Sequence, residues 1–334
     1  MRQPNTTEIA RALGLSRATV SNVINGKGRV SKGTRDRVEA ALKEAGYVRD
    51  LGAVALKTGK SRLVGVIVTD IANPFYAAVV SSIESHLSEA GFTTVLGQTK
   101  DDLDRQMQLL KECVGTGIAG LIVNPCAGTT LDDLKIAAIR DVPVVLFVRD
   151  LAGSGLELVA IDDKHGSEML GVHMVAQGYR NFAVLGGFPS TTTFQGRSAG
   201  VIETLRTAGL PAPRVCPGPI TEEFGYAETL RLYPRFPELD AIAAHNDFVA
   251  LGALRALREL GVSVGSDVGI GGFDNLNFSQ LCDPPLTTVN VCLSSIGAEA
   301  GRRLLARIRK PDTPCGVIRM QPELIVRAST RRGK

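Results

Sequence analysis

The sequence predicts an all-α head over residues 1–49 and an α/β body of two lobes, each built on a parallel, doubly wound sheet. Short capped helical patterns fill the head, and strand-like apolar runs alternate with helical patterns from residue 63 onward. The charge divides at the same place: residues 1–62 carry 13 Lys/Arg against 5 Asp/Glu, and residues 63–334 carry 25 against 29. A head of net charge +8 on a body of net charge −4 indicates that the head binds a polyanion.

Three short helices are expected in the head. Each begins at a capping residue and is stopped by a glycine or an Asn-Gly pair. The caps are Asn5, which forms a capping box with Glu8, then Ser16 and Ser31. They predict helices from residue 6 to the break at Gly14, over residues 17–24, and from residue 32 to Gly46.

The first two helices and the glycine turn between them have the pattern of a helix-turn-helix, whose second helix enters the major groove of DNA. Arg17, Ala18 and Asn22 would then face outward, where they suit guanine, the thymine methyl and adenine, respectively. Val20, Val23 and Ile24 would pack inward, and Ser16, Thr19, Ser21 and Asn25 suit phosphate contacts or capping. The alternative is a small helical domain with a solvated basic face.

The body begins with Leu63-Val64-Gly65-Val66-Ile67-Val68, a continuous apolar run that is typical of a strand buried on both faces. A helical pattern follows to Ala90, and further strand-like runs lie at 92–97, 119–123, 142–148, 158–161, 181–185, 240–244, 267–271 and 286–289. This alternation predicts parallel sheets with right-handed crossovers. About 270 residues are many for one sheet, which favours two lobes, with ligands bound at the carboxyl ends of the strands.

Two glycine motifs imitate enzyme signatures. Residues 115–120 match G-x-G-x-x-G but end a helix and open a strand, the reverse of a dinucleotide site. Residues 196–200 match the G-x-S-x-G of a nucleophile elbow, yet Ser198 falls inside a helical pattern instead of directly after a strand. A hydrolase that uses Ser198, with His245 downstream, is the alternative from another class of protein.

The composition excludes several classes of protein. The apolar share of 44% and the charged share of 22% are ordinary for a globular chain, and no apolar run is long enough to span a membrane. No secretory signal opens the sequence, so a cytoplasmic protein is expected. The six cysteines form no C-x-x-C pair and the four histidines no H-E-x-x-H motif, so neither a metal nor a cofactor is expected.

From end to end, the chain resembles the lactose-repressor (LacI/GalR) family of bacterial transcription regulators. In the head the matching motifs are Thr19-Val20-Ser21, 23–31 (Val-Ile-Asn-Gly-Lys-Gly-Arg-Val-Ser), Ala45-Gly46-Tyr47 and Leu56-Lys57-Thr58-Gly59. In the body they are Val64-Gly65-Val66, 70–75 (Asp-Ile-Ala-Asn-Pro-Phe), Asn246-Asp247, 250–253 (Ala-Leu-Gly-Ala), Gly272-Phe273-Asp274, 285–289 (Pro-Leu-Thr-Thr-Val) and 322–330 (Pro-Glu-Leu-Ile-Val-Arg-Ala-Ser-Thr).

The resemblance implies how the head binds DNA. Residues 50–60 would be a linker that holds the family's hinge helix, with Leu56 wedged into the minor groove and Ala53 beside it. Asn22, Gly52 and Val54 depart from the family's usual residues, and Gly52 lowers the helix propensity of the hinge by about 1 kcal/mol relative to alanine. The predicted DNA-binding residues are Thr6, Ser16, Arg17, Ala18, Thr19, Ser21, Asn22, Asn25, Arg29, Val30, Ser31, Thr34, Ala53 and Leu56.

For the body, the resemblance implies a periplasmic-binding-protein-like fold with an effector between the lobes. The first lobe would comprise residues 61–161 and 291–321, and the second 162–290 and 322–330. The predicted effector-binding residues are Phe75, Tyr76, Arg149, Arg197, Phe224, Asn246 and Asp274, with Phe194 a further aromatic candidate. Their chemistry fits a sugar, although two arginines would also suit a sugar acid or a phosphorylated sugar, and a purine is the remaining alternative.

Together these features predict a regulator that is not an enzyme: an effector-responsive repressor that binds a palindromic operator in double-stranded DNA. A homodimer is expected, because the sequence ends at 331–334 without the leucine heptads of the family's tetramers. The rival within this fold is a ligand-binding protein that no longer recognises DNA.

Overall fold

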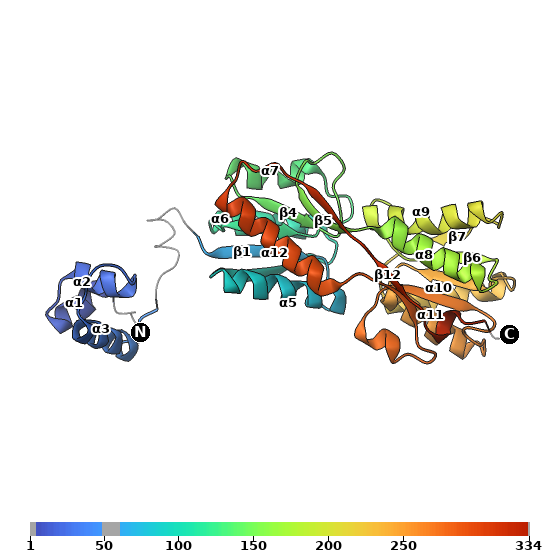
Figure 1. Cartoon of the computed structure of the whole chain (residues 1–334), viewed down its shortest axis with the longest axis horizontal. Coiled ribbons are helices and arrows are strands. Elements are labelled where there is room, and N and C mark those ends of the chain that lie inside the picture. Colours follow the sequence, from blue (N-terminus) through green and yellow to red (C-terminus); the bar gives the residue numbers. More distant parts are fainter. Residues whose placement is uncertain (1–4, 49–60, 333–334) are drawn as a thin grey trace. The chain divides into compact units, whose positions relative to one another are not determined.

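A computed structural model describes residues 5–48 and 61–332, which fall into two compact units divided between Lys60 and Ser61 (Figure 1). The predicted hinge, with Gly52, Ala53, Val54 and Leu56, lies outside the described residues. No helix among the described residues is long and apolar enough to cross a membrane. Their six cysteines are all free thiols.

The head consists of three helices, α1 (Thr6–Leu13), α2 (Arg17–Ile24) and α3 (Lys32–Glu44). Asn5 and Glu8 form the predicted capping box, in which each side chain accepts a hydrogen bond from the other residue's backbone N–H. Ser16 and Ser31 cap α2 and α3 in the same way that the sequence predicts. The helices begin at these residues because a side-chain oxygen satisfies a backbone N–H that has no partner within the helix.

One small apolar core holds the three helices together. Ile9 and Ala10 of α1, Val20 and Val23 of α2, and Val38 of α3 are its buried members. Arg37 adds a polar contact, since its Nη2 donates to the carbonyl oxygen of Leu13 at 3.1 Å. The core lies on the inner faces of the helices and leaves the outer face of α2 exposed.

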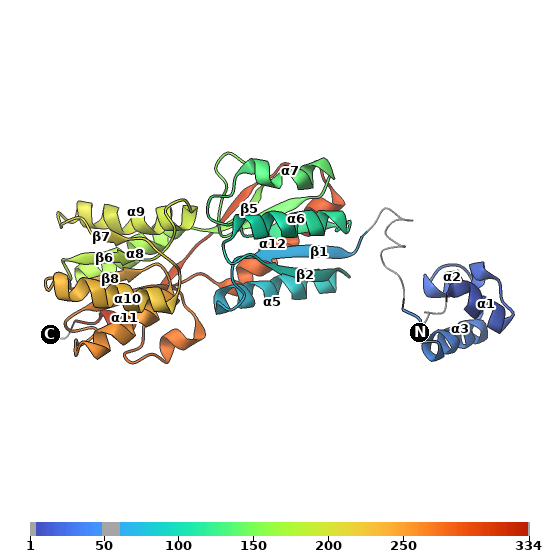
Figure 2. The ribbon, with the colours of Figure 1, turned by 180° about the vertical axis from the view of Figure 1, so that it is seen from behind.

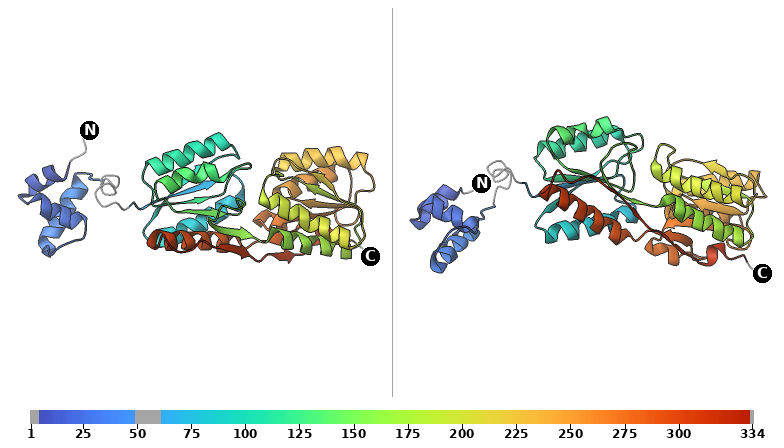
Figure 3. Two further views of the ribbon diagram at one scale, coloured as in Figure 1. Left: turned by 90° about the horizontal axis from the view of Figure 1, so that it is seen from above. Right: turned by 45° about the horizontal axis from the view of Figure 1, so that its top comes forward.

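The first lobe of the body is a sheet of six parallel strands in the order β11-β5-β4-β3-β1-β2. Helices cover both faces, α5 and α12 on one and α6 and α7 on the other (Figure 3). The bounds are β1 Leu63–Val68, β2 Thr93–Gln98, β3 Gly120–Val123, β4 Val144–Phe147, β5 Glu157–Ile161 and β11 Val317–Met320, with α5 Pro74–Glu89, α6 Leu103–Gly115, α7 Leu131–Ile139 and α12 Leu293–Arg309.

The second lobe repeats this plan in the order β12-β10-β9-β8-β6-β7, and its edge strand β12 runs antiparallel. The pair α8 and α9 covers one face, and α10 and α11 cover the other, which faces the viewer in Figure 2. The bounds are β6 Phe182–Leu185, β7 Arg214–Cys216, β8 Ala241–Ala244, β9 Gly269–Asp274, β10 Thr287–Asn290 and β12 Glu323–Ile325, with α8 Asp163–Ala176, α9 Thr192–Thr207, α10 Glu222–Leu232 and α11 Asp247–Glu259.

The chain passes between the two sheets three times, from β5 to α8, from β10 to α12 and from β11 to β12. The sequence predicted nine of the strands, because those strands contain apolar runs. It missed β7, β11 and β12, which are edge strands of three or four residues without a buried position. Because of the last crossover, β11 belongs to the first sheet and β12 to the second, although only two residues separate these strands.

Neither glycine motif forms an enzyme site. The motif at 115–120 runs from the last residue of α6 to the first of β3, as its sequence order indicates. Ser198 lies within α9 and is buried, thirteen residues after β6 has ended at Leu185. A nucleophile elbow needs its serine exposed on a sharp turn after a strand, so the geometry contradicts the hydrolase alternative.

Candidate functional site

The outer face of α2 is the candidate DNA interface. Arg17, Ala18 and Asn22 are exposed on it, whereas Val20 and Val23 are buried on the opposite face. The helical period separates the two sets, as the sequence predicts. Asn22 lies against the turn that follows α2, where Gly28 has a φ of +75° and a Cβ would come within 3.2 Å of the Asn22 amide nitrogen.

Several hydroxyl side chains of the head that were predicted to contact DNA form hydrogen bonds at the first turns of helices. The Ser16 and Thr19 hydroxyls are 2.9 Å apart at the start of α2, and Ser31 and Thr34 repeat this pair at the start of α3. Asn25 donates to the Ser21 carbonyl oxygen at 2.7 Å. Of the remaining predicted residues, Arg29 is exposed, and Thr6 and Val30 are half-buried.

A cavity of about 250 Å³ lies between the two lobes of the body, at the carboxyl ends of the strands. Six of the seven predicted effector residues line it: Phe75, Tyr76 and Arg149 from the first lobe, and Arg197, Asn246 and Asp274 from the second. Phe224 does not line it, because its ring packs beside Gly218 and the apolar core between β8 and α11.

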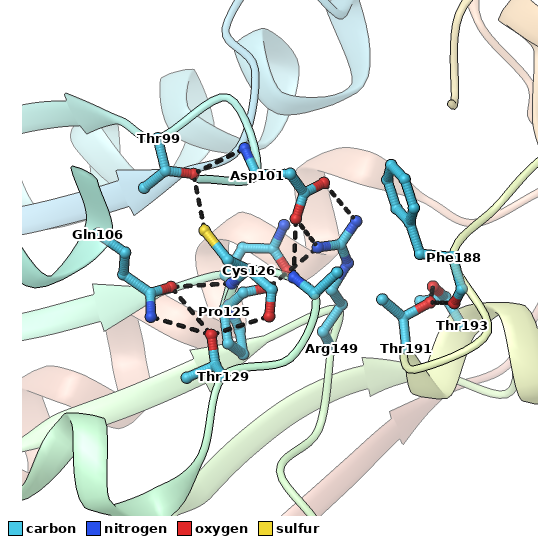
Figure 4. A network of polar contacts seen from close by, with 12 residues as sticks. Thr99, Asp101, Gln106, Pro125, Cys126, Thr129, Arg149, Phe188, Thr191 and Thr193 are labelled. Atoms are coloured by element: carbon cyan, nitrogen blue, oxygen red, sulfur yellow. Dashed lines mark hydrogen bonds and ion pairs between the residues drawn. The ribbon is translucent and has the colours of Figure 1, made fainter. Parts of the chain in front are cut away.

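Arg149 and Asp101 form the first-lobe wall of the cavity (Figure 4). Nη1 and Nη2 of Arg149 donate to the two carboxylate oxygens of Asp101 at 2.5 and 3.0 Å, and Nη1 also donates to the Pro125 carbonyl oxygen at 3.1 Å. Asp101 accepts a further hydrogen bond from the backbone N–H of Ala127 at 2.9 Å. The ion pair therefore joins the loops that follow β2, β3 and β4.

A second layer of hydrogen bonds stiffens this wall from behind. Cys126 donates from its thiol to Thr99 and from its backbone N–H to Gln106, and Gln106 in turn bonds Thr129 (Figure 4). Burial raises the pKa of the Cys126 thiol to about 11, so this group stays a neutral donor at neutral pH. The loops after β2 and β3 are thus held by side chains that do not themselves reach the cavity.

Arg197 organises the wall of the second lobe. Its Nε donates to Asp163 at 2.7 Å and its Nη1 to the His245 carbonyl oxygen at 2.7 Å. The guanidinium carbon lies 3.7 Å from the centroid of the Phe273 ring, a cation–π contact that fixes the plane of the group.

Asp274 is the polar group in this cavity whose hydrogen bonding is incomplete. It is buried, and its Oδ1 accepts no hydrogen bond from the described residues, although Arg197 Nη1 lies 3.8 Å away. Burial raises the pKa of Asp274 well above its usual value, against the lowering effect of Arg197. A buried acceptor of this kind is costly unless a donor reaches it, and the open side is the cavity.

The remaining lining combines aromatic faces with a neutral imidazole. The rings of Phe75 and Tyr76 meet edge to face with their centroids 5.0 Å apart, at the start of α5. Phe188, from the segment between β6 and α9 in the second lobe, also lines the cavity and is drawn with Arg149 in Figure 4. Burial and the charge of Arg197 lower the pKa of His245 well below its usual value, so its side chain is uncharged at neutral pH.

Sequence reasoning missed Asp70, Lys100, Asp101, Asp163 and His245. All of them lie within two residues of the end of a strand, except Asp101, which lies three residues after the end of β2. That position was the signal that could have found them, because ligands of such folds bind at strand ends. Their pairing with particular arginines depends on how the loops pack together, which no local pattern reports.

The backbone is strained around the cavity. Lys100, Asp101, Val148 and Asp274 line it with φ values of +57°, +59°, +65° and +105°, in a region that L-residues rarely adopt. Such conformations persist where the surrounding structure holds them, and they gather at binding sites. Among the described residues, no group of three His, Cys, Asp or Glu side chains could hold a metal ion.

A helix-turn-helix unit and a two-lobed body with a cavity at its strand ends define a DNA-binding regulator with a ligand-binding domain. The family model of lacI bacterial regulatory proteins matches residues 6–50, and that of a periplasmic binding protein-like domain matches residues 172–330. The HTH-type transcriptional regulator DegA of Bacillus subtilis is 31% identical over 97% of both chains. The chain therefore belongs to the lacI family of bacterial regulatory proteins.

Two solved structures support the same assignment. The lac repressor dimer bound to operator and an anti-inducer superposes with a TM-score of 0.88 at 25% identity, over 99% of this chain and 100% of that one. A complex of the transcriptional regulator CelR with cellobiose matches with a TM-score of 0.74 at 30% identity, over 98% of this chain and 99% of that one. These relatives are transcription regulators and not enzymes.

Proposed function

We propose that the protein is a repressor whose affinity for its operator is switched by a small, hydroxyl-rich effector bound between the lobes. The observation that carries the proposal is the buried Oδ1 of Asp274, which accepts no hydrogen bond from the described residues beside the cavity. A ligand hydroxyl would satisfy this acceptor, and Asn246, which can both donate and accept, lies beside it on the same wall.

A sugar or sugar derivative suits this lining. Carboxylate, amide and guanidinium groups bind hydroxyls, and the rings of Phe75 and Phe188 offer apolar faces to carbon atoms. The structural likeness to a regulator solved with cellobiose supports a carbohydrate. A purine is the alternative, for which the aromatic faces would be the main contact.

The switch we propose is a linkage between lobe orientation and operator binding. An effector held by both lobes favours one orientation, and it can shift the equilibrium only by its difference in affinity for the two states.

A homodimer would match a palindromic site, as the likeness to a repressor dimer on its operator supports. Light scattering on the full chain should give the mass of a dimer; a monomer would remove the symmetry argument.

The proposal is tested in two steps with the full chain. Selection from a random duplex library should yield one palindromic site, and a thermal-shift screen of sugars should yield a stabilising ligand. At saturating ligand, the operator Kd should change by about fivefold or more. An unchanged Kd contradicts the switch, and binding that shows neither sequence preference nor salt dependence contradicts operator recognition.

Asp274→Ala separates the two activities. We expect this variant to bind the selected operator as the wild type does but to lose its response to the ligand, because the group that accepts the ligand hydroxyl is gone. Glu203→Gln, which alters an exposed ion pair with Arg206 on α9, is the matched control and should keep both activities. Normal ligand affinity of Asp274→Ala in calorimetry would count against the site.

A further inference from the structure

Every basic side chain that lines the cavity has a carboxylate of its own. The three pairs are Lys100 with Asp70 at 2.7 Å, Arg149 with Asp101 at 2.5 Å and Arg197 with Asp163 at 2.7 Å. The two arginine pairs are buried or nearly so, with side-chain exposures of 4% and 18% for the first and 8% and 9% for the second. Charges so paired are largely neutralised toward a third group.

Each of the two arginines also donates a hydrogen bond to a backbone carbonyl oxygen. Nη1 of Arg149 bonds the Pro125 carbonyl oxygen as well as Asp101, and Nη1 of Arg197 bonds the His245 carbonyl oxygen. Arginine recognises phosphate and carboxylate through a two-pronged fork, and in Arg149 the fork of Nη1 and Nη2 already holds Asp101. An anionic ligand would have to displace Asp101, which also accepts from the backbone of Ala127.

One acidic group remains after this pairing. Asp274 shares Arg197 with Asp163, and the distance to Arg197 is longer for Asp274, 3.8 Å against 2.7 Å. Two carboxylates thus face one guanidinium, and His245, the other ionisable group on this wall, is neutral. A ligand anion would find each lining Lys and Arg side chain already paired with a carboxylate, whereas a ligand hydroxyl would give Asp274 Oδ1 the hydrogen-bond donor that it lacks.

We propose that the cavity accepts an uncharged polyol of monosaccharide size and rejects sugar acids and sugar phosphates, because Asp101 and Asp163 neutralise the two arginines. The inference rests on the proposed effector site and names the charge class of its ligand. The cavity of about 250 Å³ is smaller than the roughly 300–1,000 Å³ of sites for drug-sized ligands, which favours a single sugar ring.

The first experiment compares ligands that differ only in charge. Full-length protein is titrated in calorimetry with glucose, glucuronate and glucose 6-phosphate, and with the corresponding galactose and ribose series. At least one neutral sugar should bind, and its acid and phosphate should bind at least about tenfold more weakly. Tighter binding of an acid or a phosphate than of its neutral parent overturns the inference while leaving the effector switch intact.

The second experiment does not depend on knowing the sugar. Inorganic phosphate is the probe, at constant ionic strength, and the melting temperature is the readout. The wild type should show no saturable stabilisation, whereas Asp101→Asn should gain it because Arg149 is released. Adding Arg149→Met to that variant should abolish the gain, and Glu203→Gln, which alters the exposed ion pair with Arg206, should behave as the wild type.

Asp70→Asn gives an independent arm should Asp101→Asn fold poorly, because the Asp70–Lys100 pair is solvent-exposed and its release should also create phosphate binding. Saturable phosphate binding by the wild type that Arg149→Met removes would overturn the inference, as would failure of both Asp variants to gain it. If the phosphate results hold but no sugar binds, the charge assignment stands and the sugar effector fails.

Discussion

Arg17 stands alone among the outward residues of α2 in carrying a charge. Its side chain is exposed at the first position of the helix, next to Ala18 and five residues before Asn22. A helix that enters the major groove by its amino-terminal end brings such a residue to a base edge, and arginine binds guanine with two hydrogen bonds.

We therefore expect Arg17→Ala to weaken binding to the selected operator by about 1–3 kcal/mol and to relax the preference for one base pair in each half-site. Competition gel shifts with operators mutated at single positions measure both effects. Lys43→Ala removes the same charge from the end of α3 and should leave the base preferences unchanged. Equal loss across all competitors would make Arg17 a phosphate contact and contradict base recognition.

At the scale of single residues, hydrogen bonds between close neighbours in the chain could be predicted from the sequence, and ion pairs between distant residues could not. The caps Asn5, Ser16 and Ser31 were predictable because their hydrogen bonds reach only two or three residues along the chain. Arg149 and Asp101 lie 48 residues apart, and Arg197 and Asp163 lie 34 apart. The sequence suggested the arginines as effector ligands that suit a sugar and also a sugar acid or phosphate, but only the fold reveals the carboxylates that pair with them.

Among the elements of the second lobe, the start of α11 is fixed by one buried acid. Asp247 accepts hydrogen bonds from Leu276 N, Ser279 Oγ and Thr288 Oγ1 at 2.8, 2.6 and 2.5 Å. It thus joins α11 to β10 and to the loop after β9. Burial raises the pKa of Asp247 from 3.8 to about 6, in spite of these hydrogen bonds.

Because its folded-state pKa is the higher one, Asp247 stabilises the fold fully below about pH 4 and loses that contribution as the pH rises through about 6. The contribution is about 3 kcal/mol. Asp247→Asn has the same shape and no titration, so it should remove this component from the pH dependence of the unfolding free energy. Urea titrations at pH 4.5 and 7 measure it; an identical pH dependence in both proteins would contradict the shift.

Helices α10 and α11 pack through facing glycines. A Cβ on Gly252 would lie 2.0 Å from the Glu222 carbonyl oxygen, and one on Gly225 would lie 2.1 Å from that of Val249. Gly252→Ala should therefore lower the unfolding free energy by about 1–3 kcal/mol, since the backbones must separate. Gly115→Ala in α6, where a Cβ meets open space, is the control and should be neutral or stabilising in the same denaturation assay.

The strands of the body show which secondary-structure elements an apolar sequence pattern can predict and which it cannot. β3, β4 and β8 are buried along their whole length, and their apolar runs predict them. β11 alternates between exposed and half-buried residues over four positions, so it has no such run. It pairs with β5, about 160 residues earlier, and only that pairing makes it a strand.

In the molecule as a whole, the charge division between head and body corresponds to two tasks. The net +8 falls on the part of the chain that includes the helix-turn-helix, where phosphates must be neutralised. The net −4 falls on the two-lobed body, whose cavity pairs its own charges internally. The sequence predicted this division and both folds, because each unit has its own hydrophobic period.

Coupling between the two units is the central claim of the proposed function. By linkage, a ligand that changes operator affinity by some factor must have its own affinity changed by the operator by that same factor. Titrating the stabilising sugar into the full chain, free and saturated with its operator, measures this directly in calorimetry. We expect the ratio of the two sugar Kd values to equal the ratio of operator Kd values with and without sugar, about fivefold or more. A sugar Kd that is the same with and without operator would contradict the account.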